Sequence, residues 1–370
     1  MGNLLWLSLG SVCAVIWIYL ACFRGVFWRL RERLGTPIPT ISTAVVTAVI
    51  PARDEARLIT RVVTSLRAQR FGGSLRIVVA DDESTDGTGA AARAAGADRI
   101  VPVTPRPPGW KGKLWALSSG ISTEPHIPDY YLLTDADIEY VSPLVLQSLV
   151  AKAAEGYDLV SVMVRLRCES LAERLLVPAF VFFFFKLYPP AWGTGAAGGC
   201  MLIRREALAR IGGIESIREA LIDDCALAKR VRRSGGRVWL GISEAEVHSI
   251  REYGRAAEIR AMIARSAFAQ LHHSALLLAG TMLGMLLTYI APVALVFSGD
   301  AGATALGLGA WTISAAIFLP TVRMYGAPAW TAVCLPGIAL FYLVATVESA
   351  IDYWRGRGGL WKGRVQDSRG

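Results

Sequence analysis

The pattern of apolar and polar positions divides the chain into a mixed middle section and apolar ends. Residues 4–23 form an apolar run of about 20 residues, the length that a helix needs to cross a bilayer. Between residues 44 and 166, short apolar runs alternate with segments of helical periodicity. Three long apolar segments follow at 274–297, 302–319 and 330–350. This order predicts an N-terminal membrane anchor, an α/β domain and C-terminal transmembrane helices.

The middle section reads as repeated strand–helix units. Strands are predicted at residues 44–51, 75–82, 99–103, 130–137 and 158–166, and helices at 55–69, up to about 96, 113–121 and 142–155. Ser142 is the predicted cap of the last helix, with Pro143 in its first position. Continuous apolar strands in such units predict a mostly parallel sheet covered on both faces, and ligands of such sheets bind at the carboxyl ends of the strands.

Two further segments have membrane character. The apolar stretch 175–188 is short and interrupted by Pro178 and Lys186, so it fits a buried core helix or an interfacial or re-entrant segment. In 255–273, apolar residues at helical spacing alternate with arginines, which predicts a basic amphipathic helix on the membrane surface. His272 and His273 are expected at the level of the lipid headgroups.

Composition strengthens the membrane interpretation. Of the 370 residues 53% are hydrophobic, and a mean hydropathy of +0.41 is too high for an ordinary soluble enzyme. The net charge is +9, and clusters of Lys and Arg stand beside apolar runs, which favours a membrane surface over nucleic acid as partner. The six cysteines contain no CxxC pair, so we expect buried thiols in a reducing compartment rather than disulfides or zinc ligands.

Basic residues indicate the orientation in the membrane. Arginines directly after the first apolar run, from Arg24 to Arg33, indicate an uncleaved anchor with the following domain in the cytoplasm. If all three C-terminal segments crossed the membrane, the tail would lie outside, although its basic residues favour the inside: Arg355, Arg357, Lys362 and Arg364. One of the three segments could be re-entrant, and the sequence leaves this conflict open.

Two carboxylates end the strand predicted at 130–137. Asp135 and Asp137 are two residues apart, so an extended backbone places both on one face while Ala136 points away. Adjacent carboxylates repel each other unless a cation lies between them, and hard oxygen ligands suit Mg²⁺ or Mn²⁺ shared with substrate phosphates. We therefore expect a site for a metal ion and a diphosphate.

The acidic loop 81–88 also follows a predicted strand. It resembles the start of a calcium loop, but Arg93 stands where the bidentate glutamate is required. Its glycine-rich part resembles a dinucleotide fingerprint, but the preceding acids would repel a pyrophosphate. The remaining interpretation is a pair, Asp81 and Asp82, that accepts hydrogen bonds from a base or a ribose.

Four motifs together resemble a known family. They occur in the order seen in family 2 glycosyltransferases of GT-A fold, a Rossmann-like nucleotide-diphospho-sugar transferase fold, over about residues 43–249: 51–56, 78–88, 134–137 and 222–230. The layout of the whole chain is similar to hopene-associated glycosyltransferases, relatives of ceramide and carotenoid glucosyltransferases. Three more segments carry this closer likeness: 109–117, 195–208 and 361–364.

The resemblance implies roles for individual residues. The nucleotide pocket would contain Ala52, Arg53, Glu55, Asp81 and Asp82, and Lys113, with Lys111, would reach the diphosphate. Gly198 and Gly199 would let the backbone approach the donor sugar. The metal ion, Mg²⁺ or Mn²⁺, would be held by Asp135, Asp137 and His248. Simpler interpretations stand beside these. Glu55 could be an acid at a helix start, the two lysines could be solvated loop residues, and a single histidine is more often structural.

The pair Asp223–Asp224 matches the acidic pair of the family. The resemblance implies that Asp224 is the general base, which would take the proton of an acceptor hydroxyl as that group attacks the anomeric carbon. One base and a metal-bound leaving group fit a single displacement with inversion. Asp223 could instead, or in addition, cap the helix that follows.

One departure from the family pattern narrows the expected activity. Processive members carry Gln-x-x-Arg-Trp, whereas this chain has Met262, Arg265 and Ser266 at the nearest match. We therefore expect a membrane-bound inverting glycosyltransferase that moves one sugar from a nucleotide diphosphate donor, UDP-linked by expectation, to a lipid. The hopanoid acceptor comes from the resemblance alone. A processive polysaccharide synthase and a non-enzymatic transporter or scaffold are the alternatives.

The expected domain layout follows from these points. A multi-pass protein of the inner (plasma) membrane, with its catalytic domain in the cytoplasm, would have five parts: an anchor at 1–24, a GT-A domain at 43–250, an interface helix at 251–273, transmembrane segments at 274–350 and a basic tail at 351–370.

Overall fold

The computed structural model describes residues 2–35 and 43–359, which fall into two units. The α/β unit is formed by Arg31–Arg167 and Gly193–Glu252, and the helical unit by the described parts of Met1–Leu30, Cys168–Trp192 and Tyr253–Gly370. The stretch expected to form one continuous catalytic domain is therefore interrupted, because Cys168–Trp192 belongs to the helical unit. The segment 361–364, which carries part of the family likeness, lies outside the described residues.

A seven-stranded sheet forms the centre of the α/β unit, in the order β3-β2-β1-β4-β7-β6-β8. Its strands are β1 Val45–Ala52, β2 Ser74–Asp81, β3 Arg99–Pro102, β4 Tyr130–Thr134, β6 Leu159–Met163, β7 Cys200–Arg204 and β8 Val238–Ile242. Only β7 runs antiparallel to its neighbours, so the expected mostly parallel sheet is confirmed. The register sets Ala52 beside Asp81, which brings the ends of β1 and β2 together.

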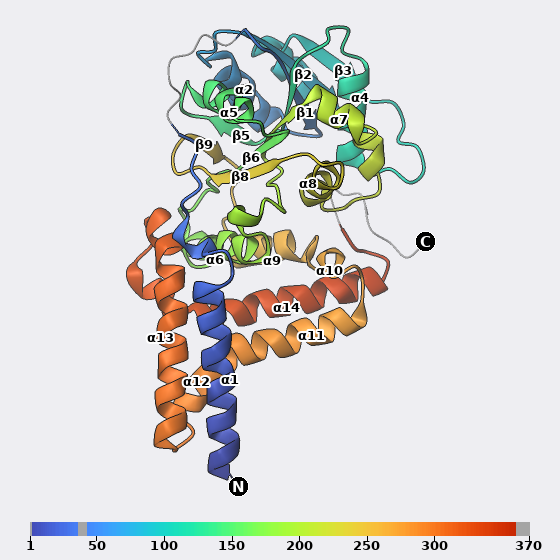
Figure 1. Ribbon diagram of the computed structural model, residues 1–370. Coiled ribbons are helices and arrows are strands. Elements are labelled where there is room, and N and C mark those ends of the chain that lie inside the picture. Colours follow the sequence, from blue (N-terminus) through green and yellow to red (C-terminus); the bar gives the residue numbers. More distant parts are fainter. Residues whose placement is uncertain (1, 36–42, 360–370) are drawn as a thin grey trace. The chain divides into compact units, whose positions relative to one another are not determined.

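Helices cover both faces of this sheet, as Figure 1 shows. One face packs against α2 Ala56–Arg67, α3 Thr88–Ala94 and α5 Val145–Ala154, and the other against α4 Gly112–Ser122, α7 Arg205–Arg210 and α8 Asp223–Arg233. Side chains alternate between the two cores, with Leu132 in the first and Leu133 in the second. Both faces of a central strand are therefore apolar, which explains the continuous apolar runs in the sequence.

The start of α5 differs from the prediction. Ser142 does not cap this helix, which begins at Val145. Instead, Gln69 reaches across from the end of α2: its Oε1 accepts from the Leu146 N–H at 3.1 Å, and its Nε2 donates to the Ser142 carbonyl at 2.9 Å. A side chain distant in sequence replaces the local cap, so no local signal could have shown it.

A second, two-stranded sheet escaped prediction because each strand is only three residues long. The strands β5 Ile138–Tyr140 and β9 Val247–Ser249 pair antiparallel, with Ile138 opposite Ser249. This pairing brings the residues after β9 next to the end of β4.

The helical unit contains five helices that are long and apolar enough to cross a membrane, among the residues described. Its elements are α1 Gly2–Cys22, α6 Leu171–Leu187, α9 Ala256–Ala264, α10 Ala267–Gln270, α11 Ala275–Met285, the π-helical turn η4 Leu286–Ile290, α12 Ala291–Val296, α13 Ala301–Met324 and α14 Leu335–Trp354. Short 3-10 turns complete the chain: η1 Phe27–Arg29, η2 Pro190–Trp192, η3 Ile214–Ile217 and η5 Ala329–Ala332. The helix expected at 175–188 is longer than predicted, because Ser170 and Glu173 form a capping box that starts it at Leu171.

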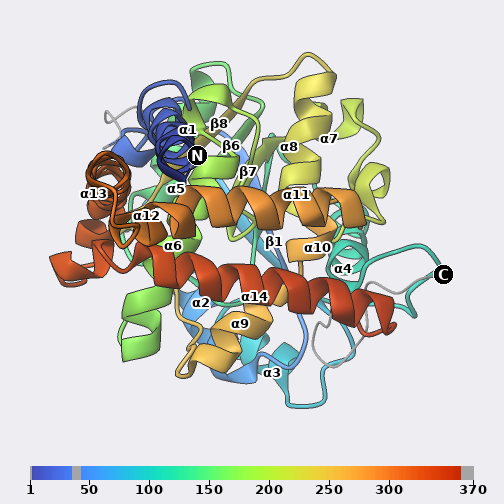
Figure 2. The same ribbon diagram turned by 90° about the horizontal axis from the view of Figure 1, so that it is seen from below.

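Within this unit the long helices run in two directions. Figures 1 and 2 show α1 and α13 side by side, whereas α11 and α14 lie across them. A side chain added at Gly302 would meet Leu7, and one added at Gly10 would meet Leu306, so α1 and α13 run parallel to each other.

The single amphipathic helix expected over 255–273 is wrong. The segment forms two short helices, α9 and α10, separated at Arg265–Ser266. After α10 the chain turns through positive φ at His272 and His273, and the His273 ring stacks on Tyr353 at 4.1 Å. Of the six free cysteines, Cys13, Cys200 and Cys225 are buried, but the expectation of buried thiols is wrong for the exposed Cys22.

Candidate active site

Two interlocked loops shape the end of the sheet where β1 and β2 finish. The loop after β1 and the loop after β2 exchange hydrogen bonds: Asp54 Oδ1 accepts from the Thr85 N–H, and Asp86 Oδ2 accepts from the Ala56 N–H, each at 2.9 Å. Asp54 and Glu83 adopt positive φ, a backbone conformation that side chains rarely take. The two motifs that were separate in sequence thus form one rigid rim.

The residues expected to bind the nucleotide meet at this rim. Arg53 Nη1 donates to the Asp82 carbonyl at 2.8 Å and lies 3.5 Å from its carboxylate. Ala52 is buried, and its carbonyl accepts from the Asp82 N–H at 2.8 Å. Asp81 Oδ1 accepts from the Ser84 N–H at 3.1 Å. The structure therefore brings four of the five predicted nucleotide residues together, and Glu55 follows them at the start of α2.

Lys113 connects two acidic motifs. Its Nζ lies 2.9 Å from Asp135 Oδ1, at the end of β4, and 3.0 Å from Asp223 Oδ2, at the start of α8. Burial alone would lower the pKa of Lys113, but the Asp135 and Asp223 carboxylates outweigh it and raise the pKa, so this lysine is charged. The Lys113 side chain is therefore held between two carboxylates, and its interpretation as a solvated loop residue is wrong. Lys111 contributes its backbone N–H, which donates to the Arg218 carbonyl at 2.9 Å.

The second acid of the pair faces the glycine loop before β7. Asp224 Oδ2 accepts from the Gly198 N–H at 2.9 Å, and its Oδ1 accepts from the Cys225 N–H at 2.7 Å. Burial, together with the Asp223 charge, raises the pKa of Asp224 to about 6, although Lys113 opposes this rise. Asp223 does not cap α8, because Ile222 is the cap residue and the Asp223 side chain turns to Lys113. The two acids therefore have different environments.

A second cation, absent from the sequence-based prediction, joins two of the predicted acids. Arg251 donates from Nε to Asp137 Oδ2 at 2.7 Å, and its Nη2 contacts Glu55 Oε1. Burial would lower the pKa of Arg251, but the Asp137 and Glu55 carboxylates outweigh it and raise the pKa. Ser249 Oγ donates to the same Asp137 oxygen at 3.4 Å. Glu55 is therefore the partner of an arginine rather than only an acid at a helix start.

His248 lies on β9 next to Ser249, but its neighbour across the sheet is not Asp137. It pairs with Glu139 across β5 and β9, while Ser249 and Arg251 are the residues that reach Asp137. Burial and the nearby Arg165 lower the pKa of His248, so its ring is neutral at pH 7. Neutrality suits a metal ligand, and the assignment stays a prediction.

The donor set decides whether a divalent metal fits here. Among the described residues, no group of three His, Cys, Asp or Glu side chains converges as a metal cage. Mg²⁺ and Mn²⁺ are commonly held by one or two carboxylates, with phosphate oxygens of a substrate filling other positions. The Asp135 and Asp137 carboxylates meet this requirement, so the residues present fit a metal ion shared with a diphosphate.

Comparison with known proteins agrees with this geometry. Residues 47–212 match the family model described as Glycosyl transferase family 2. This segment is a glycosyl transferase family 2 domain. It contains the sheet from β1 to β7, both interlocked loops, Lys113 and the Asp135–Asp137 pair, so the α/β unit is that of a glycosyltransferase with GT-A fold. A search of curated proteins found no significant match.

One solved structure shows the same fold. A mannosyltransferase from Pyrobaculum calidifontis, in complex with GDP-mannose and Mn²⁺, is 20% identical, with a TM-score of 0.57 over 92% of this chain and 99% of its own. Because 92% of this chain is covered, the likeness extends beyond the glycosyltransferase domain into the apolar helices. Glucosyl-3-phosphoglycerate synthase from Mycobacterium tuberculosis is more distant, at 21% identity and a TM-score of 0.43 over 64% of this chain and 85% of its own.

Proposed function

We propose that this protein is a membrane-bound inverting glycosyltransferase that moves a sugar from a nucleotide diphosphate donor, UDP-linked, to a lipid hydroxyl. The observation that carries the proposal is the convergence on Lys113. This single cation joins the strand-end carboxylate Asp135 to Asp223, next to the helix-start acid Asp224. The GT-A domain supplies the reaction class, and the arrangement of these side chains supports the proposed roles.

The donor diphosphate would lie where the two cations stand. Lys113 and Arg251 would contribute positive charge to its oxygens, while Asp135 and Asp137 would hold Mg²⁺ or Mn²⁺. When bound, the metal stabilises the charge that develops on the leaving diphosphate. Arg53, Asp81 and Asp82 would contact the base and ribose, and Gly198 and Gly199 would let the backbone approach the sugar.

Asp224 is the proposed general base. As the acceptor oxygen forms its bond to the anomeric carbon, the bond from that carbon to the diphosphate breaks, and the hydroxyl proton passes to a carboxylate oxygen of Asp224. Two backbone N–H groups orient this carboxylate, and its remaining lone pairs are available. One displacement at the anomeric carbon inverts its configuration.

A lipid acceptor is supported by the apolar helices that share the chain with the domain. Five helices could cross a membrane by length and composition, so the enzyme would work where lipid hydroxyl groups are concentrated. Within lipids, the hopanoid class rests on the sequence resemblance alone. A processive synthase is less well supported because the Gln-x-x-Arg-Trp motif is absent.

The directions of the helices support one membrane topology, which would also remove the conflict over the basic tail. Phe318 of α13 lies 5.1 Å from Phe182, which lies 5.3 Å from Phe27 just after α1. The C-terminal ends of α1 and α13 therefore lie on the same side of the helical unit, the side of Arg24. We propose that this side faces the cytoplasm. We further propose that α14, which lies across α13, does not cross the membrane, and that the tail stays in the cytoplasm (Figure 2).

The proposed function is tested by transfer from labelled nucleotide sugars to a lipid extract. We expect one sugar per acceptor with a UDP-sugar, and no transfer after chelation of divalent ions until Mn²⁺ is restored. Asp224→Asn should lower the rate by about 10²–10⁴-fold while UDP binding persists, and Asp137→Asn should also weaken Mn²⁺-dependent UDP binding. Full activity of Asp224→Asn would rule out this mechanism, and long polymers would favour the synthase.

A further inference from the structure

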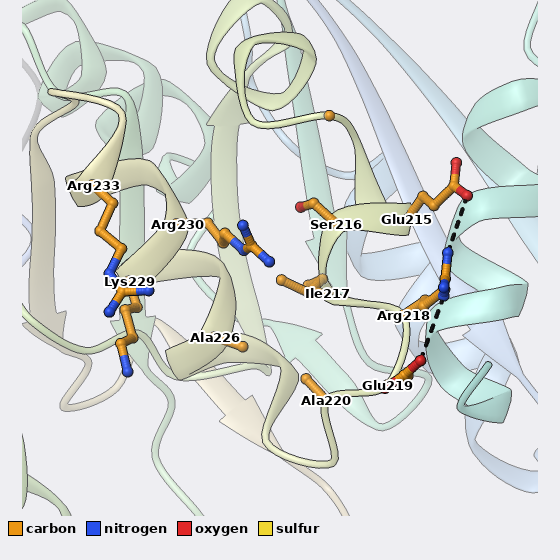
Figure 3. A pocket seen from close by; sticks show the side chains of 11 residues that line it. Glu215, Ser216, Ile217, Arg218, Glu219, Ala220, Ala226, Lys229, Arg230 and Arg233 are labelled. Atoms are coloured by element: carbon orange, nitrogen blue, oxygen red, sulfur yellow. Dashed lines mark hydrogen bonds and ion pairs between the residues drawn. The ribbon is translucent and has the colours of Figure 1, made fainter. Parts of the chain in front are cut away.

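A basic pocket lies beside the active site, between η3 with its following loop and α8. Its volume is about 610 Å³, and Figure 3 shows the side chains that line it. The pocket is built entirely within the α/β unit. Arg230 belongs to the family motif at 222–230, but the proposed reaction does not use the side chains around the pocket.

Charge in this pocket is unbalanced. Its two acids, Glu215 and Glu219, both pair with Arg218, at 3.4 and 3.7 Å. The other three cations are Lys229, Arg230 and Arg233 of α8. In the part of the chain that the structure describes, none of these three side chains has a hydrogen bond or ion pair. The cation of the active site, Lys113, contrasts with them because two carboxylates neutralise it.

A simpler explanation covers part of this pattern. Cations near the end of a helix interact favourably with its dipole, and exposed charges are usually solvated. That explanation does not account for the position of all three cations around one pocket. Lys229 and Arg233 are four residues apart, so they repel each other on one helix face. Arg230 points across the pocket toward Ser216 and Ile217, as Figure 3 shows. An anion in the pocket would relieve the repulsion.

We propose that this pocket binds the phosphate group of an organic phosphate. The planar guanidinium of Arg230 can donate to two phosphate oxygens, and the lysine adds a point charge. The volume exceeds that of a single phosphate and lies in the range of small-molecule sites. Apolar lining from Ile217, Ala220 and Ala226 leaves room for the organic part. A soluble phosphate monoester and a phospholipid headgroup share this chemistry.

Occupancy of the pocket would act on the neighbouring acids through α8. The same helix carries Asp223 and Asp224 at its start and the three cations toward its end. A ligand held between η3 and α8 encloses the connecting residues 218–222, which lead directly to the acidic pair. The Arg218 carbonyl in this segment also accepts from the Lys111 N–H. We therefore expect bound phosphate to slow local opening of 214–222.

Hydrogen–deuterium exchange of the full-length protein tests the proposal, independently of any transfer activity. In detergent, glycerol 3-phosphate at constant ionic strength should protect residues 214–222. In nanodiscs, added phosphatidic acid should do so if the source is a lipid. Protection in either arm supports the site and identifies its source, and the absence of protection in both arms overturns it.

Matched variants separate this site from a general charge effect. Lys229→Gln with Arg230→Gln should weaken binding by about tenfold for each cation removed. The control, Arg93→Gln with Arg205→Gln, removes the same charge from an exposed and a half-buried position outside the pocket and should bind as the parent does. Lys229→Gln with Arg233→Gln, both exposed, serves if the Arg230 variant does not fold. Equal protection in the pocket variants and the parent overturns the proposal.

Discussion

Arg251 donates a hydrogen bond to Asp137 at 2.7 Å and at the same time contacts Glu55. Both acids are nearly buried, with side chains 12% and 8% exposed, and this guanidinium supplies a counter-charge to each. The arginine lies two residues beyond β9, and the β5–β9 pairing carries it to the acids. A cation therefore already stands beside the carboxylate proposed to bind the metal.

Removing this arginine should destabilise the protein. Arg251→Ala removes a counter-charge from two nearly buried carboxylates, and we expect the free energy of unfolding to fall by about 2–3 kcal/mol. Thermal unfolding in detergent measures the loss, and Mn²⁺ should restore part of it because the metal replaces the missing charge. Arg61→Ala is the control: it breaks the more exposed pair with Glu139 and should cost less than about 1 kcal/mol. Equal losses in both variants would contradict the proposed role of Arg251.

The pH dependence of transfer should follow the Asp224 carboxyl. Burial and Asp223 raise its pKa to about 6, so it is protonated below that pH and cannot accept a proton. We expect log(kcat/KM) to rise with pH and to level off above about 6. A profile that is flat between pH 5 and pH 7 would assign the base elsewhere.

Lys113 provides a second test of the same titration. Its charge lowers the Asp224 pKa, against burial and Asp223, so Lys113→Met should move the acidic limb of the profile to higher pH. The variant should also weaken donor binding, which appears in KM. Lys152→Met, a change at a half-buried lysine on α5, should leave the limb in place. A limb at the same pH in Lys113→Met would show that the two groups are not coupled.

The two glycines before β7 should respond differently to alanine. At Gly198 a methyl group would lie 3.3 Å from both Asp224 Oδ2 and Lys113 Nζ, so Gly198→Ala should reduce transfer with little change in Tm. At Gly199 it would lie 3.1 Å from Ile138 and 3.3 Å from Val164, which are apolar neighbours. Gly199→Ala should therefore lower stability by about 1 kcal/mol or more through overpacking. The reverse order of effects would place the reacting groups away from Gly198.

The proposed topology is testable with single cysteines in a background without native ones. A cysteine at Ser298, between α12 and α13, should react with a membrane-impermeant reagent in intact cells. A cysteine at Arg355, after α14, should react only after permeabilisation. Labelling of both positions in intact cells would mean that α14 crosses the membrane.

Much of the domain could be predicted from local signals in the sequence. Strands buried on both faces leave continuous apolar runs, as in β1, β2 and β4, and the acids that end them mark the ligand edge. Asp81, Asp82, Asp135 and Asp137 were found in this way. The length of the apolar runs likewise indicated the helices that are long and apolar enough to cross a membrane.

What only the tertiary structure decided depends on contacts between distant residues. Gln69, just after α2, accepts a hydrogen bond from the first turn of α5. Cys168–Trp192 belongs to the helical unit although the segments on both sides of it belong to the α/β unit. No local pattern indicates that Lys113 bridges Asp135 to Asp223, or that Arg251 bridges Asp137 to Glu55. The sequence determined which acids reach the edge of the sheet, because strand periodicity is local. Only the tertiary structure decided which cations neutralise these acids, because the ion pairs join residues that are distant in sequence.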